Sequence, residues 1–532
     1  MKLVTVAQMR ELEQAAASAG VREQALMESA GLTVAQEAWM TVGMMPDRRV
    51  LVLVGSGNNG GDGLVAARRA RWLGAAVDVY LLRPRLEDDP QWRALMEVDA
   101  DAGSAAESDA EPTVNGVASD DAQLSTLDGL LDRSSCVVDA LLGTGVGRPI
   151  EGDLALVMER LHAARERPVH PDLIAVDLPT GVDADTGRAD PLAVAADMTV
   201  ALGHPKVGLF MQPGQQFVGR IVQADIGLAQ ETEAALPYEE ITSRQTAALL
   251  PPRPPDAHKG TFGSVVVAAG SRRYPGAARL AAEAAARSGA GLVVLAAPES
   301  VQPLLVHGLP DAVHEPLPDA DGALNGVSAP ALLRALPGAR ALLVGPGLSF
   351  TAATEEFVRL LLAGLDAVAG LRAAVFDADA LNVLATLPGW HRELLLPRVL
   401  TPHPGEMARL TGLTTEEVQS DRIRHAVEYA AEIDSVVVLK GACTVVAAPD
   451  GRVRVSGVAN PMLATAGTGD VLAGFVGGLL AQGLEPFDAA SVAVYLHAEA
   501  GREVERVHGA AAGLAQDLLH AVGESRKLLD GR

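Results

Sequence analysis

The sequence predicts a two-domain α/β protein, and three observations support this fold class. The chain has 532 residues, a length typical of roughly two to four domains. Short apolar runs that end in glycine or aspartate recur in both halves, with helical stretches between several of them. A polar and then proline-rich stretch separates the two sets of runs, as an interdomain connection would. We therefore expect a first domain over residues 1–228, a linker over 229–243 and a second domain over 244–532.

The composition narrows the class of protein. Apolar runs are strand-sized, and the start of the chain lacks the apolar block of a signal peptide, so we expect a cytoplasmic protein without a membrane span. Cys136 and Cys443 alone cannot form a disulfide framework or a cysteine-rich zinc site. The net charge of −24 disfavours binding to nucleic acid. An anionic ligand would need donors placed locally, such as backbone amides, helix N-termini or a few lysines.

The first half opens with residues 7–40, whose apolar side chains have the spacing of a helix, and continues with strand-like apolar runs. These runs are VLVLVG (50–55), VVDALLG (137–143), LIAVDLP (173–179), MTVALG (198–203) and RIVQADIG (220–227). Their alternation with helical stretches predicts a parallel sheet covered by helices on both faces.

The stretch GSGNNGGDG (55–63) follows the first of these runs and precedes a helical stretch. It is neither G-x-G-x-x-G nor a P-loop, because no Gly-Lys-Ser/Thr ends it. Its glycines permit positive φ and a close approach of backbone N–H groups to an anion. Asp62 either contacts the ligand or caps a helix that starts at Gly63.

Polar loops also follow the next strands, and ligands of open α/β sheets bind beyond the carboxyl ends of strands. Gly143–Gly147 offers a second glycine cradle. Asn59, Asp139 and Thr180 offer oxygen ligands for a hard cation, and Asp177 could act as an acid or base. The alternatives are that each aspartate only caps a turn or helix and that the second glycine cluster is only a tight turn.

The motifs SGNNGGDG, DALLGTG and DLPTGVD, preceded by LMESAG, resemble the NAD(P)H-hydrate epimerase family over residues 3–228. The resemblance implies a Rossmann-like three-layer sandwich, interconversion of the R and S forms of hydrated NADH and NADPH, and a bound potassium ion. Asn59, Asp139 and Thr180 would hold potassium, with threonine at 180 where many members have serine. Asp177 would bind the hydrated ring and assist epimerisation. The cofactor would also contact Asn58, Asn59, Gly60, Gly61, Asp62, Gly143, Thr144, Gly145, Val146, Gly147, Arg148 and Pro149.

The second half contains short apolar runs like those of the first half. Its runs are SVVVAAG (264–270), GLVVLAAP (291–298), ALLVGPG (341–347), AAVFDAD (373–379), RVLTPHPGE (398–406) and SVVVLKGAC (435–443). This pattern again predicts α/β structure with many parallel strands. We find no sequence repeat between the two halves.

Gly467-Thr-Gly-Asp470 precedes an apolar helix rich in small residues. The free N–H groups of a helix start can stabilise a phosphoryl group in transfer, and Asp470 could take a proton from a substrate hydroxyl. A plain helix cap is the alternative. Lys440 stands at a strand end, where it could meet a phosphate. The carboxylates of FDADALN (376–382) either reach a metal or cap the next helix.

HPGE, GTGD, HKGTFGSVVVAAGS, DADALN and KGACT resemble the ADP-dependent NAD(P)H-hydrate dehydratase family over residues 240–525. The resemblance implies a ribokinase-like fold and phosphorylation of the hydrate by ADP, with Mg²⁺, followed by loss of phosphate. Asp470 would be the base. The hydrate would face Ala277, Gly347, His403 and Asp470. The nucleotide would face Lys440, Gly441, Ala442, Cys443, Thr444 and Gly469.

One position departs from the second family's pattern. Met462 stands where the family usually has glycine, and it would strain the loop if that position needs positive φ. The other family motifs of this half are present.

Together the two halves predict a bifunctional repair enzyme that acts on hydrated NADH and NADPH and consumes ADP, as a homo-oligomer. Two other hypotheses remain open. The second half could instead phosphorylate a small alcohol, since GTGD alone permits this. The first half could be a binding or scaffolding module without activity.

Overall fold

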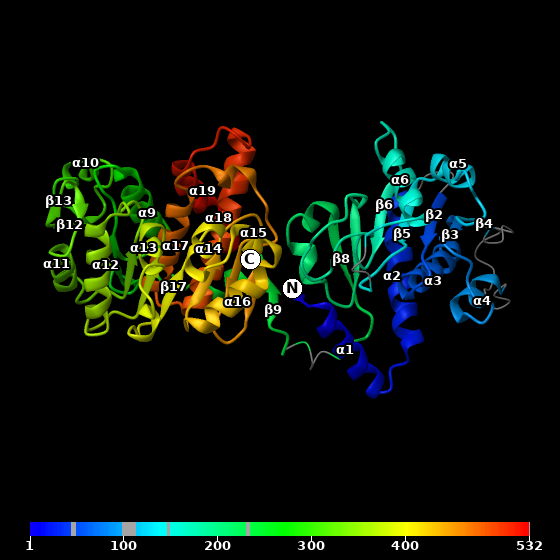
Figure 1. Cartoon of the computed structure of the whole chain (residues 1–532), viewed down its shortest axis with the longest axis horizontal. Helices are drawn as coiled ribbons and strands as arrows, with labels where there is room; N and C mark the ends of the chain where they lie inside the picture. Colours follow the sequence, from blue (N-terminus) through cyan, green and yellow to red (C-terminus); the bar gives the residue numbers. More distant parts are fainter. Residues whose placement is uncertain (44–48, 98–112, 146–148, 230–232, 234, 531–532) are drawn as a thin grey trace. The chain divides into compact units, whose positions relative to one another are not determined.

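The computed structural model describes residues 1–43, 49–97, 113–145, 149–229, 233 and 235–530 (Figure 1). It divides into two compact units, Lys2–Leu236 and Pro237–Arg532 with Met1. No helix in the described ranges is both long and apolar enough to cross a membrane. Neither Cys136 nor Cys443 forms a disulfide, and both are buried.

The first unit is built on one parallel sheet in the order β4-β3-β2-β5-β6-β7-β8. Its strands are β1 (Lys2–Leu3), β2 (Arg49–Val54), β3 (Ala76–Leu81), β4 (Thr113–Val117), β5 (Cys136–Ala140), β6 (Asp172–Val176), β7 (Met198–Leu202) and β8 (Arg220–Ala224). Its helices are α1 (Val6–Ser18), α2 (Glu23–Val42), α3 (Asn58–Trp72), α4 (Pro90–Met96), α5 (Ser125–Arg133), α6 (Asp153–Arg165), η1 (Val207–Phe210) and η2 (Gly214–Phe217).

Both faces of this sheet are covered, because its central strands are apolar on both sides. Val50, Val52 and Val54 of β2 pack in a core with α2 and α3. The alternate residues, Leu51 and Leu53, pack in a second core with α5 and α6. The first unit is therefore a three-layer sandwich, and its strand order is that of a Rossmann fold, as the family resemblance implies.

The second unit contains a larger mixed sheet. Its strands run in the order β9-β20-β19-β18-β17-β16-β15-β10-β11-β12, where β18, β19 and β20 are antiparallel neighbours and the others pair in parallel. From β12 to β18 the order is the same as in the first unit. The predicted α/β class and the two-domain organisation are confirmed.

The bounds of the second unit's elements are as follows. The strands are β9 (Tyr238–Glu240), β10 (Ser264–Ala268), β11 (Leu292–Pro298), β12 (Val313–Leu317), β13 (Asp319–Ala320), β14 (Ala323–Leu324), β15 (Ala341–Val344), β16 (Ala373–Phe376), β17 (Arg398–Leu400), β18 (Val436–Leu439), β19 (Val445–Ala447) and β20 (Val453–Val455). The helices are α8 (Ser243–Leu249), α9 (Pro275–Arg287), α10 (Gln302–Val306), α11 (Ser328–Ala335), α12 (Ala352–Leu365), α13 (Asp379–Leu384), η3 (Trp390–Arg392), α14 (Pro404–Thr411), α15 (Thr415–Ser420), α16 (Arg422–Glu432), η4 (Pro461–Ala464), α17 (Thr468–Ala481), α18 (Pro486–His508) and α19 (Ala515–Asp530).

The expected linker, residues 229–243, is not entirely a connection. Its β9 pairs in parallel with β20 and so extends the sheet of the second unit. Residues 230–232 and 234 of this stretch lie outside the described ranges.

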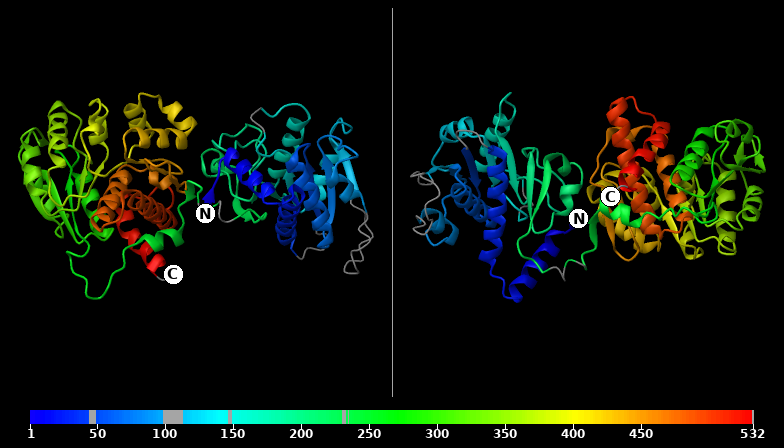
Figure 2. Two further views of the ribbon diagram at one scale, coloured as in Figure 1. Left: turned by 90° about the horizontal axis from the view of Figure 1, so that it is seen from below. Right: turned by 180° about the vertical axis from the view of Figure 1, so that it is seen from behind.

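Helix α17 packs closely against α9 because its glycines leave room for the α9 backbone. Figure 2 shows the ribbon of the chain from two further sides. A Cβ atom at Gly474 would lie 2.3 Å from the carbonyl oxygen of Ala281, and one at Gly478 would lie 2.4 Å from that of Ala285. Contacts this short exclude any larger residue at either position. The small-residue pattern of α17 therefore fixes the helix that carries Asp470 at its start.

Candidate active sites

The first candidate site lies where the strand order of the first unit reverses. β2, β5 and β6 are neighbours, and their carboxyl ends carry Gly55–Asp62, Asp139 and Asp177. The connections of β2 lead to one side of the sheet and those of β5 to the other, which leaves a crevice between them. The three polar loops of the sequence therefore meet at one edge.

The glycine stretch is a short turn followed by the first turn of a helix. Helix α3 begins at Asn58 with Gly57 as its N-cap, so Asn58–Asp62 lie inside it. The expectation that Asp62 caps a helix starting at Gly63 is therefore wrong. The free N–H groups at the start of α3 are a suitable site for an anion.

Glycines of this stretch are needed for packing, Gly55 and Gly60 among them. A Cβ atom at Gly55 would lie 1.8 Å from the carbonyl oxygen of Leu141, and one at Gly60 would lie 2.0 Å from that of Gly55. A Cβ atom at Gly57 would meet nothing within 4 Å. The turn is thus held against the loop after β5 by backbone contact, and no larger residue would fit at Gly55 or Gly60.

Arg85, which belongs to none of the motifs, holds the glycine turn in place through hydrogen bonds. Its Nη1 donates to the carbonyl oxygens of Gly55 at 3.0 Å and Gly57 at 3.3 Å. Its Nη2 lies 2.5 Å from the carboxylate of Asp89, which also caps α4. Arg85 therefore links the turn to the segment after β3.

Asn59, Asp139 and Thr180 converge around the backbone of Leu142. Nδ2 of Asn59 donates to the Leu142 carbonyl oxygen at 2.9 Å, and the Leu142 N–H donates to Oγ1 of Thr180 at 3.0 Å. Thr180 in turn donates to Asp139 through its hydroxyl at 2.8 Å and its N–H at 2.9 Å. The predicted cation ligands therefore form one connected cluster, with Oδ1 of Asn59 left as an acceptor.

Asp139 is a buried carboxyl whose hydrogen bonds come from neutral groups. Only 2% of its surface is exposed, and its donors are Thr180 and the N–H of Leu141. Burial raises the pKa of Asp139, although these hydrogen bonds oppose the rise. A cation beside it would offset the penalty for burying its charge.

Asp177 follows β6 and forms a buried ion pair with Lys206. The Lys206 ammonium donates to Oδ1 of Asp177 and, at 3.1 Å, to the carbonyl oxygen of Leu202. Lys206 is 1% exposed. No sequence motif marks Lys206, although it stands just beyond the end of β7, the same kind of position as Asp177.

Asp62 is a second buried carboxyl group that interacts electrostatically with this pair. Burial, and next the Asp177 carboxylate, raise the pKa of Asp62 well above its usual range, while Lys206 opposes this. No donor within the described ranges makes a hydrogen bond to its side chain, which is 7% exposed. The site thus combines a carboxyl group paired with lysine and a second carboxyl group whose pKa is raised by its burial.

The second glycine cluster is only partly described. Gly143 lies against Asn59, since a Cβ atom there would be 3.2 Å from Cβ of Asn59. Thr144 is half-buried, and Gly145 and Pro149 are exposed. Val146, Gly147 and Arg148 lie outside the described residues.

The second candidate site is formed by four neighbouring strand ends of the second unit. Gly347 follows β15, Asp377 follows β16, His403 follows β17 and Lys440 follows β18. Gly347 has a φ of 64°, and a Cβ atom there would lie 2.8 Å from Cβ of Ala277. The structure therefore places these predicted residues along one edge of the sheet.

Lys440 is the centre of the charge network at this edge. Its ammonium lies 2.7 Å from Oδ1 of Asp377 and 3.8 Å from Oε2 of Glu406. Burial alone would lower the pKa of Lys440, but Asp377, Glu406 and Asp470 outweigh it and the pKa is raised. A Cβ atom at Gly469 would lie 3.4 Å from this ammonium, so the lysine lies in van der Waals reach of the start of α17.

Asp470 lies in the first turn of α17, whose N-cap is Gly467. Burial, and next the carboxylate of Asp377, raise the pKa of Asp470 to about 7, while Lys440 opposes the rise. A carboxylate with this pKa matches the requirement for a general base near neutral pH.

His403 caps α14, and this fixes its tautomer. Its Nδ1 accepts hydrogen bonds from the N–H groups of Gly405 at 3.0 Å and Glu406 at 3.3 Å. Burial, and next Lys440, lower the pKa of His403, so the ring is neutral and Nε2 carries its proton. Nε2 lies 3.4 Å from Oε1 of Glu406, and because the ring is half-exposed its N–H can also reach a ligand.

Gly441–Thr444 form the turn between β18 and β19. Gly441 has a φ of 141°, and Nη2 of the buried Arg422 donates to the carbonyl oxygens of Leu439 at 2.8 Å and Lys440 at 3.1 Å. Gly441 and Ala442 are exposed, whereas Cys443 is buried. Arg422 thus holds the backbone on either side of the predicted nucleotide lysine.

Met462 does not strain its loop. It lies in η4, is fully buried and is not among the residues with positive φ. Its N–H donates to Oδ1 of Asn460 at 2.8 Å, and its side chain packs beside Gly513. The condition for strain at this position, a positive φ, is therefore not met.

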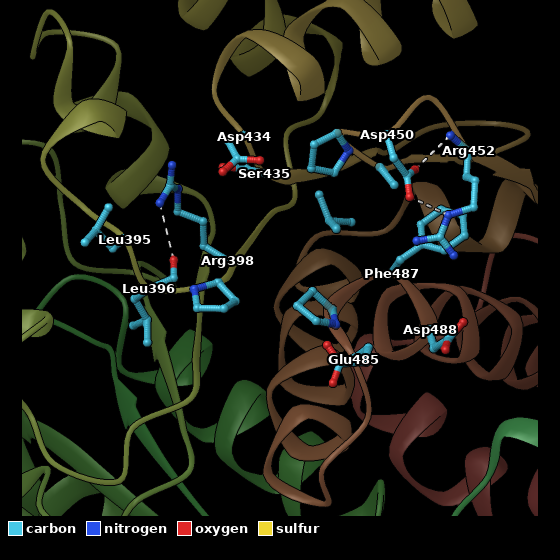
Figure 3. A pocket seen from close by; sticks show the side chains of 15 residues that line it. Leu395, Leu396, Arg398, Asp434, Ser435, Asp450, Arg452, Glu485, Phe487 and Asp488 are labelled. Atoms are coloured by element: carbon cyan, nitrogen blue, oxygen red, sulfur yellow. Dashed lines mark hydrogen bonds and ion pairs between the residues drawn. The ribbon is translucent and has the colours of Figure 1, made fainter.

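A pocket of about 650 Å³ in the second unit contains none of the predicted site residues (Figure 3). Its lining includes Arg398, Asp434 and Phe487, and an Asp450–Arg452 ion pair at 2.7 Å. β17 begins at Arg398 and β18 begins next to this lining, so the pocket lies at the amino ends of strands whose carboxyl ends carry His403 and Lys440. It is separate from the candidate active site.

Two family models match the chain, one in each unit. The model described as YjeF-related protein N-terminus matches residues 23–208, and the model described as NAD(P)H-hydrate dehydratase matches residues 265–523.

Full-length relatives and a solved structure are also similar. The bifunctional NAD(P)H-hydrate repair enzyme of Moorella thermoacetica is 40% identical over 98% of this chain and 95% of its own length. That of Thermofilum pendens is 37% identical over 94% of this chain and 91% of its own. A crystal structure of ADP/ATP-dependent NAD(P)H-hydrate dehydratase from Bacillus subtilis, co-crystallised with ATP and Mg²⁺, is 35% identical with a TM-score of 0.47, covering 55% of this chain and 98% of that one. The chain belongs to the family of bifunctional NAD(P)H-hydrate repair enzymes.

Proposed function

We propose that each unit carries one step of the repair of hydrated NADH and NADPH. The first unit interconverts the R and S hydrates, and the second unit dehydrates the S form at the expense of ADP, which yields NAD(P)H, AMP and phosphate. The observation that carries the proposal is the position of Lys440, 2.7 Å from Asp377 and close to both Asp470 and Gly469 at the start of α17. Phosphoryl transfer needs such a cation beside a base and a helix N-terminus.

In the second unit, Lys440 and the N–H groups at the start of α17 would bind the phosphates of ADP. Gly441, Ala442, Cys443 and Thr444 would border the nucleotide. Asp470 would accept the proton of the substrate hydroxyl as its oxygen attacks the β-phosphorus, and AMP would leave. Elimination of the phosphate, together with a proton from the adjacent ring carbon, then forms the double bond that restores the nicotinamide ring.

The hydrate would lie between Ala277, Gly347 and His403. The Nε2 proton of His403 offers a donor to the substrate, while Gly347 and Ala277 leave space because neither has a side chain beyond Cβ. Magnesium usually binds through nucleotide phosphates with one or two carboxylates. Asp377 and Glu406 are the carboxylates nearest to Lys440 that could support it.

In the first unit, Asp177 and Asp62 would act on the hydrated ring as a pair. Asp62, whose pKa is raised by burial, can donate a proton to a leaving hydroxyl, and Asp177, held in place by Lys206, can accept one from incoming water. The N–H groups of Asn58–Gly61 and the loop from Gly143 to Pro149 would hold the cofactor's phosphates.

The cluster of Asn59, Asp139 and Thr180 fits potassium. The atoms that would bind the ion are amide, carboxylate and hydroxyl oxygens, the ligands that hard cations prefer. Asp139 is buried without a basic partner in the described ranges. Potassium would supply a positive charge beside the first glycine turn. The homo-oligomeric state and the cytoplasmic location remain predictions from the sequence.

The decisive experiment incubates the intact chain with hydrated NADH and ADP and follows recovery of the reduced-nicotinamide absorbance. Recovery that requires ADP is expected. A folded protein that phosphorylates a small alcohol but leaves the hydrate unchanged would support the kinase alternative instead.

For the first unit, chromatography of the R and S hydrates should show interconversion that Asp177→Ala abolishes; unchanged interconversion would favour the scaffold alternative.

A further inference from the structure

The second unit contains a second pocket, of about 860 Å³, that no step of the proposed reaction uses. It lies between α8, the proline-rich segment after it, and α19. Phe262, beneath one of its walls, precedes β10, and Gly289 precedes β11, so the pocket lies toward the amino ends of these strands. The predicted active-site residues follow the carboxyl ends, which separates the two sites.

Three arginines line this pocket, one each from α8, the segment after it and α19: Arg244, Arg253 and Arg526. The described lining residues include no acidic side chain. On a chain with a net charge of −24, a hollow lined by arginines is a local reversal of charge.

Two of the guanidinium groups converge on one backbone position. Arg253 donates to the carbonyl oxygen of Gly289, and Nη1 of Arg526 donates to that of Ser288 at 2.6 Å. A Cβ atom at Gly289 would lie 2.2 Å from Nη2 of Arg253 and 3.0 Å from Nη1 of Arg526. Two positive charges this close repel each other, and an anion between them would relieve the repulsion.

A purely structural role accounts for part of this arrangement. Ser288 and Gly289 end α9, and arginines often bind the last carbonyl groups of a helix. Arg253 also donates to Oε1 of Gln482 at 3.3 Å, and these contacts occupy only some of the five N–H donors of its guanidinium. Capping does not account for Arg244, which is exposed and has no hydrogen-bond or ion-pair partner among the described residues.

The remaining walls are apolar, and the volume suits an organic molecule. Leu250, Pro251 and Leu529 line the pocket beside the arginines. Small-molecule sites typically enclose roughly 300–1,000 Å³, far more than a bare ion needs. Guanidinium groups bind phosphate through paired, charge-assisted hydrogen bonds.

We propose that this pocket binds an organic phosphate of about nucleotide size, with the phosphate on the arginines and the apolar part against Leu250, Pro251 and Leu529. The site is distinct from the one at Lys440. A nucleoside monophosphate has this chemistry, so AMP is the probe.

Equilibrium dialysis of the intact chain against AMP tests the proposal. Wild type should show a class of sites that Arg244→Glu weakens about tenfold or more, since a charge-assisted contact becomes a repulsion. Arg244 makes no contact that the fold needs, so this variant should keep its hydrate-dehydrating activity. Arg334→Glu, an exposed position on α11, is the matched control for the change in net charge and should leave AMP binding unchanged.

Two further probes identify what the pocket recognises. Inorganic phosphate should displace AMP from the Arg244-dependent sites, whereas adenosine should not bind them. The proposal is wrong if Arg244→Glu binds AMP as wild type does, if Arg334→Glu weakens binding equally, or if adenosine binds as tightly as AMP. Because these readouts are binding isotherms, their failure is distinguishable from failure of the repair reaction.

Discussion

The ammonium of Lys440 lies 2.7 Å from Oδ1 of Asp377, a carboxylate whose side chain is only 1% exposed. Asp377 also accepts a hydrogen bond from the hydroxyl of Thr401 at 2.7 Å, so it links the ends of β16, β17 and β18. A buried carboxylate held this way gives Lys440 a fixed position and keeps it charged.

Asp377→Asn should therefore reduce the rate of ADP-dependent dehydration by about 100-fold or more, because the Lys440 ammonium is no longer held in position to contact the phosphate. Removing one partner of a buried ion pair should also destabilise the second unit by about 3 kcal/mol. Steady-state rates with hydrated NADH and thermal unfolding measure the two effects. The epimerisation rate is the internal control and should not change; an unaltered rate and KM for ADP would contradict the assigned role of the pair.

The pKa of about 7 at Asp470 predicts a pH dependence of dehydration. Below pH 7 the carboxyl is protonated and cannot accept the hydroxyl proton, so kcat/KM should rise about tenfold per pH unit and level off above 7. Asp470→Asn should lower the rate by about 100-fold or more and abolish this rise.

The same variant separates catalysis from folding. Burial disfavours the charged form of Asp470, so the amide should be at least as stable as wild type above pH 7. A pH profile through the range 5–9 that is flat in wild type would refute the role of Asp470 as the base.

The buried pair of Asp177 and Lys206 allows a double-mutant test in the first unit. Lys206→Met leaves a buried carboxylate unpaired and should destabilise this unit by about 3–5 kcal/mol. Combining it with Asp177→Asn should restore most of the stability but not the epimerisation, which needs the carboxylate. Denaturant unfolding and chromatography of the hydrate isomers read the two outcomes. Epimerisation at the wild-type rate in the double variant would show that the pair is only structural.

Thr180 offers a matched test of the potassium cluster. Thr180→Ser keeps the hydroxyl that contacts Asp139 and Leu142, whereas Thr180→Val removes it at nearly the same volume. The valine variant should lose potassium-stimulated epimerisation and about 1–3 kcal/mol of stability, because buried polar partners lose a hydrogen bond. Rates are compared in potassium and in a bulky organic cation of equal ionic strength. Equal potassium activation of the serine and valine variants would exclude Thr180 as a ligand.

Gly60 and Gly57 differ in what surrounds them. Gly60→Ala places a Cβ atom 2.0 Å from the carbonyl oxygen of Gly55 and should destabilise the first unit by about 1–3 kcal/mol or more, with loss of epimerisation. Gly57→Ala meets open space at a helix N-cap with negative φ and should change stability only by a few tenths of a kcal/mol to about 1. Similar unfolding midpoints for the two variants would contradict the packing described for the turn.

Much of the fold could be predicted because the apolar runs that became β2, β5, β6, β10, β15 and β16 are short, separate and followed by glycine or aspartate. The sequence does not predict strand β3, because no glycine or aspartate directly follows its apolar residues. It does not predict the antiparallel strands β19 and β20 either, because hairpin strands of three residues carry little periodicity. Motif resemblance supplied the candidate residues, but residues outside motifs, such as Arg85 and Lys206, were not found. Their roles depend on contacts with segments distant in the chain.

By itself the sequence determined the α/β class, the division into two parts and the family, since periodicity and motifs are properties of local stretches. Only the tertiary structure decided which residues meet. It placed Asn59 beside Leu142 and Thr180, paired Asp177 with Lys206, and set Lys440 between Asp377 and the start of α17. It also determined charge states, because the pKa values of Asp62 and Asp470 depend on burial and on neighbours that only the folded sheet edge brings together.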